Sequence, residues 1–239
     1  EREFNPQGLK YADLTRIYQF TYTADVLLET VINTLYAMNI VEYAEPNYIM
    51  KPFYTVNDPS LSLQYHINKI KANLAWDITK GDTNVVIGIV DSEIQWDHTD
   101  LSPNIKYNYS DPIDGQDNDG DGYVDNYRGY DLGELDNDTK SSANIHGSHV
   151  SGCASPATDN GIGVAGPGFK CKLLPVKIAN SSGSLIAGYE GIEYAANHGA
   201  RIINCSWGSA GGGQAGQEVI DYVTINKDAL VVASAGNDG

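Results

Sequence analysis

One apolar run sets the expected architecture of this chain: Val85-Val86-Ile87-Gly88-Ile89-Val90, followed directly by Asp91. A strand that is apolar at every position is typical of a parallel sheet whose two faces are both covered. Later runs of the same type and length predict further buried strands. They occupy residues 173–178, 201–206 and 230–233.

The segment between the runs at 173–178 and 201–206 has the spacing of an amphipathic helix. Its apolar residues share one helical face: Leu185, Tyr189, Ile192 and Ala196. Strands that alternate with helices predict an α/β fold, with a mostly parallel central sheet and helices on both faces. The chemistry of such sheets lies just past the carboxyl ends of the strands. Those ends carry Asp91, Ser206-Trp207-Gly208 and Gly236-Asn237.

The first 55 residues follow another pattern, in which a strand, a helix and a second strand succeed one another. Residues 17–22 alternate like a strand, Asp25 opens a helical spacing that reaches Met38, and residues 40–44 resemble a second strand. The segment 51–60 contains two prolines and reads as a linker. We therefore expect a small α+β unit with its linker at residues 1–55, and a larger α/β unit at residues 56–239.

Composition excludes some classes of function. The chain has 15 Lys and Arg against 31 Asp and Glu, a net charge of −16, which disfavours nucleic-acid binding. No apolar run approaches the roughly 18 residues of a membrane span. Because the chain opens at Glu1 and not Met, we expect an internal piece whose targeting segment has been removed. The chain has three cysteines, which could form one disulfide and leave one thiol, or could all be buried thiols. The pairing that we expect is Cys153 with Cys171, with Cys205 buried.

Three polar residues are candidates for catalysis, although each also has an ordinary structural explanation. Asp91 could cap a turn or orient a histidine, and Asn237 could end a strand or donate to an oxyanion. His146 opens the run His146-Gly147-Ser148-His149-Val150-Ser151-Gly152, whose small residues allow close approach to a strand. A zinc-protease helix would need histidines four apart with Glu beside the first, whereas His146 and His149 are three apart.

Taken together and in this order, the motifs resemble the subtilisin-like (subtilase) family of serine proteases. They are Asp91-Ser92 after a buried strand, His146-Gly-Ser-His-Val, Ile203-Asn204-Cys205-Ser206-Trp207-Gly208 and Ser-Ala-Gly-Asn237, within a resemblance that runs from about Asn57 to Gly239. The resemblance implies that Asp91 orients the base, His146 is the general base and Asn237 is the oxyanion donor. It also implies that Ser206, Trp207 and Gly208 pair with the substrate backbone, with Trp207 beside a pocket for apolar side chains. The chain departs from the family in having Glu93 for the usual Gly and Ser148 for the usual Thr.

The resemblance also implies a pro-domain in the first unit. Val41-Glu42-Tyr43-Ala44-Glu45-Pro46-Asn47-Tyr48 resembles the end of a subtilase pro-domain, which would block the cleft as an intramolecular inhibitor. An independent appendage is the alternative. The implied activity is that of a secreted serine endopeptidase acting on proteins or peptides.

The serine nucleophile is expected beyond residue 239, because the family supplies it from a Gly-Thr-Ser segment well past the Gly-Asn motif. Ser206, Ser209 and Ser234 lack the Gly-x-Ser-x-Gly elbow of other hydrolases. The chain alone should therefore be inactive, with its nucleophile on a separate C-terminal chain or on a missing remainder. A non-catalytic binding protein of the same fold and a metal-dependent hydrolase built on His146, His149 and Asp91 are the alternatives.

An acidic loop, residues 117–125, has the spacing of a structural calcium site. The predicted ligands are Asp117, Asp119, Asp121 and Asp125, with the carbonyl of Tyr123. Arg128 occupies the position where an EF-hand has Glu, so an EF-hand is excluded, while a solvated acidic loop stays open. The run Gly161-Ile-Gly163-Val-Ala-Gly166 is not a dinucleotide site, because a loop precedes it and Pro167 prevents the helix. By resemblance, this segment would hold a second calcium ion with Asp100.

Overall fold

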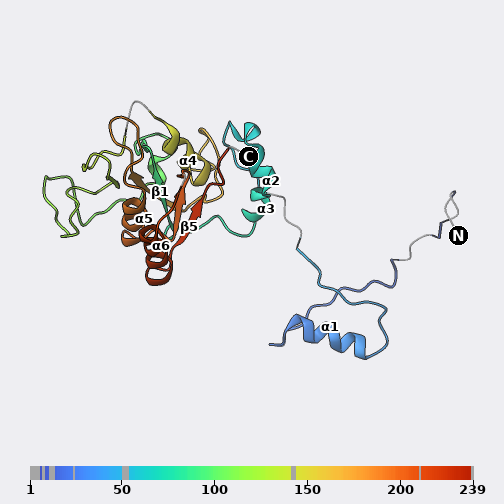
Figure 1. Cartoon of the computed structure of the whole chain (residues 1–239). Helices are drawn as coiled ribbons and strands as arrows, with labels where there is room; N and C mark the ends of the chain where they lie inside the picture. The colour runs from blue at the N-terminus through green and yellow to red at the C-terminus, as the bar shows by residue number, and fades with distance from the viewer. Residues whose placement is uncertain are drawn as a thin grey trace. The chain divides into compact units, whose positions relative to one another are not determined.

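The chain divides into two units, Glu1–Pro52 and Phe53–Gly239, close to the predicted boundary. The computed structural model describes residues 6, 9–10, 14–23, 25–49, 54–140, 144–209 and 211–237. Figure 1 shows that the larger unit carries the sheet. Among the described helices, none has the length and apolar character needed to cross a bilayer.

The described part of the smaller unit contains one helix, α1 (Leu28–Ala37), at the predicted position. The strands predicted at 17–22 and 40–44 are not formed, which corrects that part of the α+β prediction. Helix α1 buries none of its residues, so it provides no core on which strands could pack. An isolated pair of strands without such support is marginally stable in water.

The larger unit is built on five parallel strands in the order β2-β3-β1-β4-β5. Their bounds are β1 Val86–Asp91, β2 Tyr130–Asp131, β3 Lys172–Lys177, β4 Ile202–Cys205 and β5 Leu230–Ala233. The four strands predicted from apolar runs are present, and they confirm the parallel sheet. The two-residue β2 was not predicted. Strand β1 is central, because β3 and β4 flank it on either side.

Helices cover both faces of this sheet, as predicted. Val86 and Val90 of β1 belong to a core cluster with α5 (Gly188–Asn197), against which Val219 and Ile220 of α6 (Gln214–Asp221) also pack. Ile87 and Ile89 point the other way and join a second cluster, against which Val150 and Ala154 of α4 (His146–Ala154) pack. Alternate residues of one buried strand therefore serve two cores.

The remaining elements are short. They are α2 (Tyr65–Lys69), α3 (Ala72–Ala75), the 3₁₀ turns Leu61–Leu63 and Ser102–Asn104, and the π-helical turn Tyr222–Asn226. Within the predicted helix, Ile192 and Ala196 are buried on α5, but Leu185 precedes the helix and is 42% exposed. Leu185 instead forms a β-bridge with Ala179, so its assignment to the helix was wrong.

All three cysteines are free thiols, so the predicted pairing of Cys153 with Cys171 is wrong. Cys153 lies on α4. The sulfur of Cys171 instead packs beside Gly81, where a β-carbon added to the glycine would stand 3.0 Å from this sulfur. Cys205 is buried, as expected.

Candidate active site

Asp91 is a buried carboxylate at the carboxyl end of the central strand. It is 1% exposed, and its Oδ1 accepts the backbone N–H of Ser92 at 2.7 Å. Its Oδ2 is buried and has no hydrogen-bond partner among the described residues. A carboxylate held in this way is fixed in direction and available to a neighbouring base.

The imidazole of His146 lies beside this carboxylate. His146 is the first residue of α4, and its backbone N–H donates to Oδ1 of Asn144 at 3.0 Å. The imidazole Nδ1 lies 2.8 Å from Oδ1 of Asp91, while about half of the side chain is exposed. A carboxylate at Nδ1 selects the tautomer that leaves Nε2 free to accept a proton, and it stabilises the imidazolium that results.

Gly147 makes this approach possible. A β-carbon at this position would stand 2.0 Å from the carbonyl oxygen of Glu93 and 3.0 Å from Cβ of Asp91. The prediction that small residues after His146 allow close contact with a strand is therefore confirmed. Because backbone blocks the space, no side chain can be accommodated without moving α4.

We expect Gly147→Ala to separate His146 from Asp91. Forcing a methyl group into filled space costs about 1–3 kcal/mol, and the melting temperature should fall by several degrees. The matched control is Gly152→Ala on the same helix, where the nearest atom to a new β-carbon is 3.7 Å away. Thermal unfolding of both variants tests this, and equal melting temperatures would contradict it.

Strand β4 continues into the predicted substrate-binding residues beside this pair. The indole Nε1 of Trp207 donates to the carbonyl of Val90, the residue before Asp91, at 2.8 Å. The same indole covers Gly188, where a β-carbon would approach it to 2.6 Å. Ser206 accepts from the side-chain amide of Asn204 at 2.8 Å. Ser206, Trp207 and Gly208 are thus at the predicted strand end.

Cys205, the last residue of β4, lies close to Asp91. Burial, together with the negative charge of Asp91, raises the pKa of its thiol to about 12. Cys205 is therefore a neutral, buried thiol across the physiological pH range, and it packs in the core beneath the site.

Asn237 follows β5 at the same edge of the sheet. Ser234, the first residue past β5, donates its backbone N–H to the carbonyl of Cys205 at 3.0 Å, which aligns the ends of β4 and β5. The segment that ends in Asn237 therefore starts from the edge where Asp91 lies, and the Asn237 side chain is exposed. The structure thus joins Asp91 and His146 by a direct contact, and it places Asn237 after a neighbouring strand end without a hydrogen bond to either residue.

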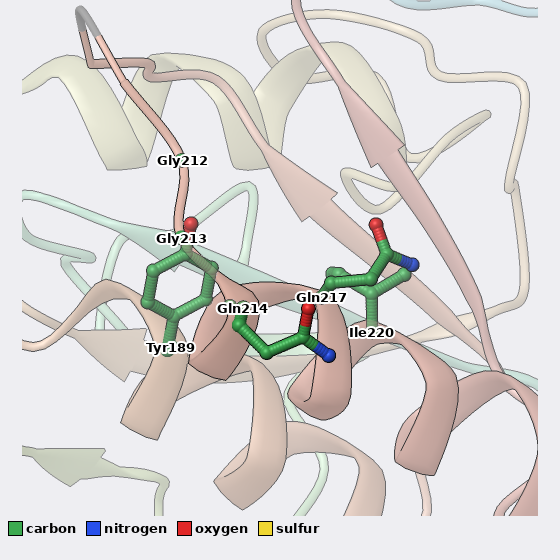
Figure 2. A pocket seen from close by; sticks show the side chains of 7 residues that line it. Tyr189, Gly212, Gly213, Gln214, Gln217 and Ile220 are labelled. Atoms are coloured by element: carbon green, nitrogen blue, oxygen red, sulfur yellow. The ribbon is translucent and has the colours of Figure 1, made fainter.

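A hollow of about 370 Å³ lies further along the chain from Trp207, between α5 and α6 (Figure 2). Its lining residues are Tyr189, Gly212, Gly213, Gln214, Gly216, Gln217 and Ile220. None of the predicted catalytic or substrate-binding residues lines this hollow. It is therefore separate from the Asp91–His146 pair.

The acidic loop brings carboxylates together, although in a different set from the one predicted. Oxygen atoms of Asp111, Asp117 and Asp119 lie within 4.8 Å of one another. Asp111 is fully buried and accepts the backbone N–H groups of Asn118 and Asn126, at 2.8 and 2.7 Å. Backbone N–H groups, that of Gly122 foremost, hold the pKa of Asp117 below its ordinary value. Asp111 was missed because it lies outside the alternating run that begins at residue 117.

The other predicted ligands make contacts within the protein. Asp121 lies 2.7 Å from Nε2 of His198 and also accepts from the side chain of Asn126 at 2.7 Å. Asp125 accepts the backbone N–H groups of residues 114 and 115, both at 2.8 Å. The ring of Tyr123 packs edge-on against Tyr194, with the ring centroids 4.8 Å apart. These contacts fold the loop onto the end of α5.

The segment from residue 157 to 166 forms a loop around the buried carboxylate of Asp100. Oδ2 of Asp100 accepts the backbone N–H of Val164 at 2.9 Å. Oδ1 of Asp100 accepts from the side-chain amide of Asn160, also at 2.9 Å. A β-carbon at Gly163 would stand 2.1 Å from this carboxylate. Burial, and to a lesser degree the charge of Asp100, raises the pKa of nearby Asp58.

The fold and the pair define a class of protein: an α/β protein with a carboxylate and an imidazole in contact past the end of its central strand, as in hydrolases that activate a nucleophile. The sequence profile of the subtilase family (Peptidase_S8) matches residues 82–239. The chain belongs to this family.

Several relatives are named as proteases. The chain is 34% identical over 215 residues to thermophilic serine proteinase of Bacillus sp. (strain AK1), a match that covers 89% of this chain and 48% of the relative. It is 37% identical over 189 residues to thermitase of Thermoactinomyces vulgaris, a match that covers 78% and 59%. A protease structure from Pseudoalteromonas arctica PAMC 21717 is 28% identical with a TM-score of 0.59, and the match covers 77% of this chain and 60% of that one. The chain spans about half the length of the curated relatives it matches.

Proposed function

We propose that the protein to which this chain belongs is a serine endopeptidase in which His146 is the general base and Asp91 its orienting acid. The observation that carries the proposal is the 2.8 Å contact between His146 and Asp91, at the strand end where such sheets hold their chemistry. In the reaction, Nε2 of His146 takes the proton of a serine hydroxyl as the oxygen attacks the peptide carbonyl. It then returns that proton to the leaving amine, while Asp91 stabilises the imidazolium between these steps.

The proposal gives Asn237 a catalytic role and residues 206–208 a role in substrate binding. Asn237 donates its amide N–H to the oxyanion, which is worth about 10²–10³ in turnover in serine proteases. Residues 206–208 pair with the backbone of the peptide as an added strand. The serine nucleophile is proposed to lie beyond residue 239, on the same polypeptide or on a separate one, because the family supplies it from a Gly-Thr-Ser segment past the Gly-Asn motif.

The same proposal includes calcium at the acidic loop. Three carboxylates with oxygens within 4.8 Å of one another repel unless a cation lies among them. Each carboxylate has lone pairs beyond those that accept hydrogen bonds, and calcium prefers oxygen ligands of this kind. Asp111, Asp117 and Asp119 would hold the ion, which would join the two ends of the segment 111–119. The buried Asp100 is proposed to belong to a second calcium site, as the family resemblance implies.

Two further parts of the proposal rest on the family. Residues 1–55 are proposed to be a partial pro-domain with its linker, which inhibits the cleft until it is removed. Secretion is proposed because relatives at 29–35% identity are named as extracellular proteases, from Natrialba magadii, Dichelobacter nodosus and Xanthomonas campestris.

A fluorophosphonate probe tests the proposed reaction, because it forms a covalent adduct with an activated serine. We expect the full-length protein to be labelled and to lose peptidase activity in proportion. A zinc-selective chelator should leave both labelling and activity unchanged. A protein that hydrolyses nothing and takes no label would be a binding protein of the same fold, and inhibition by the zinc chelator would indicate a metal-dependent hydrolase.

A further inference from the structure

The two positions at which this chain departs from its family touch each other. The hydroxyl of Ser148, in the first turn of α4, donates to Oε1 of Glu93 at 3.1 Å. Glu93 is only 1% exposed, although a carboxylate is costly to bury without partners. This partly buried contact joins two side chains that are 55 residues apart, and so it ties separate segments of the chain together.

The contact between Ser148 and Glu93 lies next to the contact between His146 and Asp91 along the same two segments. His146 contacts Asp91, and two residues further along both segments Ser148 contacts Glu93, with the same separation of 55 residues. Between them, Gly147 lies against the carbonyl of Glu93. The first turn of α4 is therefore attached at two successive points, to Asp91 at the end of β1 and to Glu93 in the segment that follows it.

Ser148 also fixes the segment that follows β1. Its Oγ accepts the backbone N–H of Gln95 at 2.8 Å, so the single hydroxyl proton is directed to Glu93. On its other side, this segment is held by Thr139, whose backbone and hydroxyl both bond to Ile94, at 2.9 and 2.8 Å. The segment bearing Glu93 is thus anchored, and it can serve as a fixed support for α4.

We propose that Glu93 and Ser148 are positioning residues that hold α4 so that His146 keeps its contact with Asp91. The inference rests on the proposed function, because it assigns these residues a part in the same reaction. Neither residue touches the reacting atoms: both act through His146. A displacement of about 1 Å in a catalytic group can lower turnover by as much as about 10²-fold.

The test compares Ser148→Ala with Ser151→Ala in the full-length protein. Ser151 is a matched control, because it is buried on the same helix and its hydroxyl bonds within α4, to the carbonyl of Gly147 at 2.8 Å. We expect Ser148→Ala to lower kcat by about 10-fold or more with KM nearly unchanged, and Ser151→Ala to keep the kcat of the wild type. Equal kcat in the two variants would overturn the proposal.

A second readout is the NMR signal of the Nδ1–H proton of His146, with the resonance assigned from a His146→Ala spectrum. This proton lies in the 2.8 Å contact between Nδ1 of His146 and Oδ1 of Asp91. Loosening the contact weakens this charge-assisted hydrogen bond, so the resonance should move upfield in Ser148→Ala and stay constant in Ser151→Ala. An unchanged resonance in Ser148→Ala would overturn the proposal even if that variant is less active.

The double variant Glu93→Ala with Ser148→Ala shows whether the two residues act as a unit. We expect it to lose no more kcat than the worse single variant, because both changes remove the same attachment. If the fold-losses of kcat in the two single variants multiply in the double variant, the two residues act independently, which would contradict a shared role. If the wild-type protein hydrolyses no peptide, the proposed function fails, whereas the NMR comparison still decides whether Ser148 positions His146.

Discussion

Replacing His146 by alanine in the full-length protein is expected to lower kcat by about 10⁴-fold or more, with KM changed only slightly. The reason is the loss of the proton acceptor for the nucleophile, which acts in the transition state and contributes little to substrate binding. Initial rates on an unstructured protein substrate, at several substrate concentrations, separate kcat from KM. The protein should stay folded, because the imidazole is half exposed and buries little surface.

The control for this variant is His149→Ala. His149 lies on the same helix, three residues after His146. Both histidines would be needed for activity only if they bound a catalytic metal ion together. We expect His149→Ala to keep kcat within a few-fold of wild type. Equal losses in the two variants would contradict the role given to His146 and would support a metal-dependent reaction.

Removing calcium is expected to lower the melting temperature of the full-length protein by about 5–10 °C, if the ion is first supplied at about 100 times its Kd. The reason is that calcium binds only the folded loop, and without it the carboxylates of Asp111, Asp117 and Asp119 repel one another. Thermal unfolding in excess calcium and in excess chelator measures the effect.

Asp111→Asn identifies the site, because Asp111 is the buried member of the group. This variant should bind one calcium ion fewer by equilibrium dialysis and show a smaller thermal shift. Asp221→Asn removes the same charge from an exposed position on α6 and should behave like the wild type. A wild-type protein that melts at the same temperature with calcium and with chelator would contradict the proposed ion.

The longer strands of the sheet were predictable because each is a run of mostly apolar residues. Strands β1, β3, β4 and β5 were found in this way, whereas β2 has two residues and no pattern to detect. The expectation that all of these strands are buried was wrong for β5, whose Leu230 and Val232 are exposed because β5 is the edge strand of the described sheet. The strands predicted at 17–22 and 40–44 are not formed, because no buried surface is available for them to pack on. Their sequences suit a strand, but α1 provides no buried face to receive them.

The contact between His146 and Asp91 was predictable from motif order, and the close approach of α4 followed from the small residue Gly147. The contact between Glu93 and Ser148 was not predictable, because each appeared only as a separate departure from the family. Asp111 was likewise missed, since its carboxylate reaches the acidic loop through tertiary folding and not through regular spacing. Pairings of this kind depend on distances between segments, which no local pattern encodes.

The most direct test of the central claim is a crystal structure of the full-length protein carrying a covalent serine-directed inhibitor. We predict that Nδ1 of His146 lies 2.8 Å from Oδ1 of Asp91, as it does here. We also predict that Nε2 of His146 faces the modified serine, and that the amide of Asn237 points at the inhibitor oxygen. An imidazole turned away from Asp91, or an adduct on a serine remote from both residues, would contradict the account.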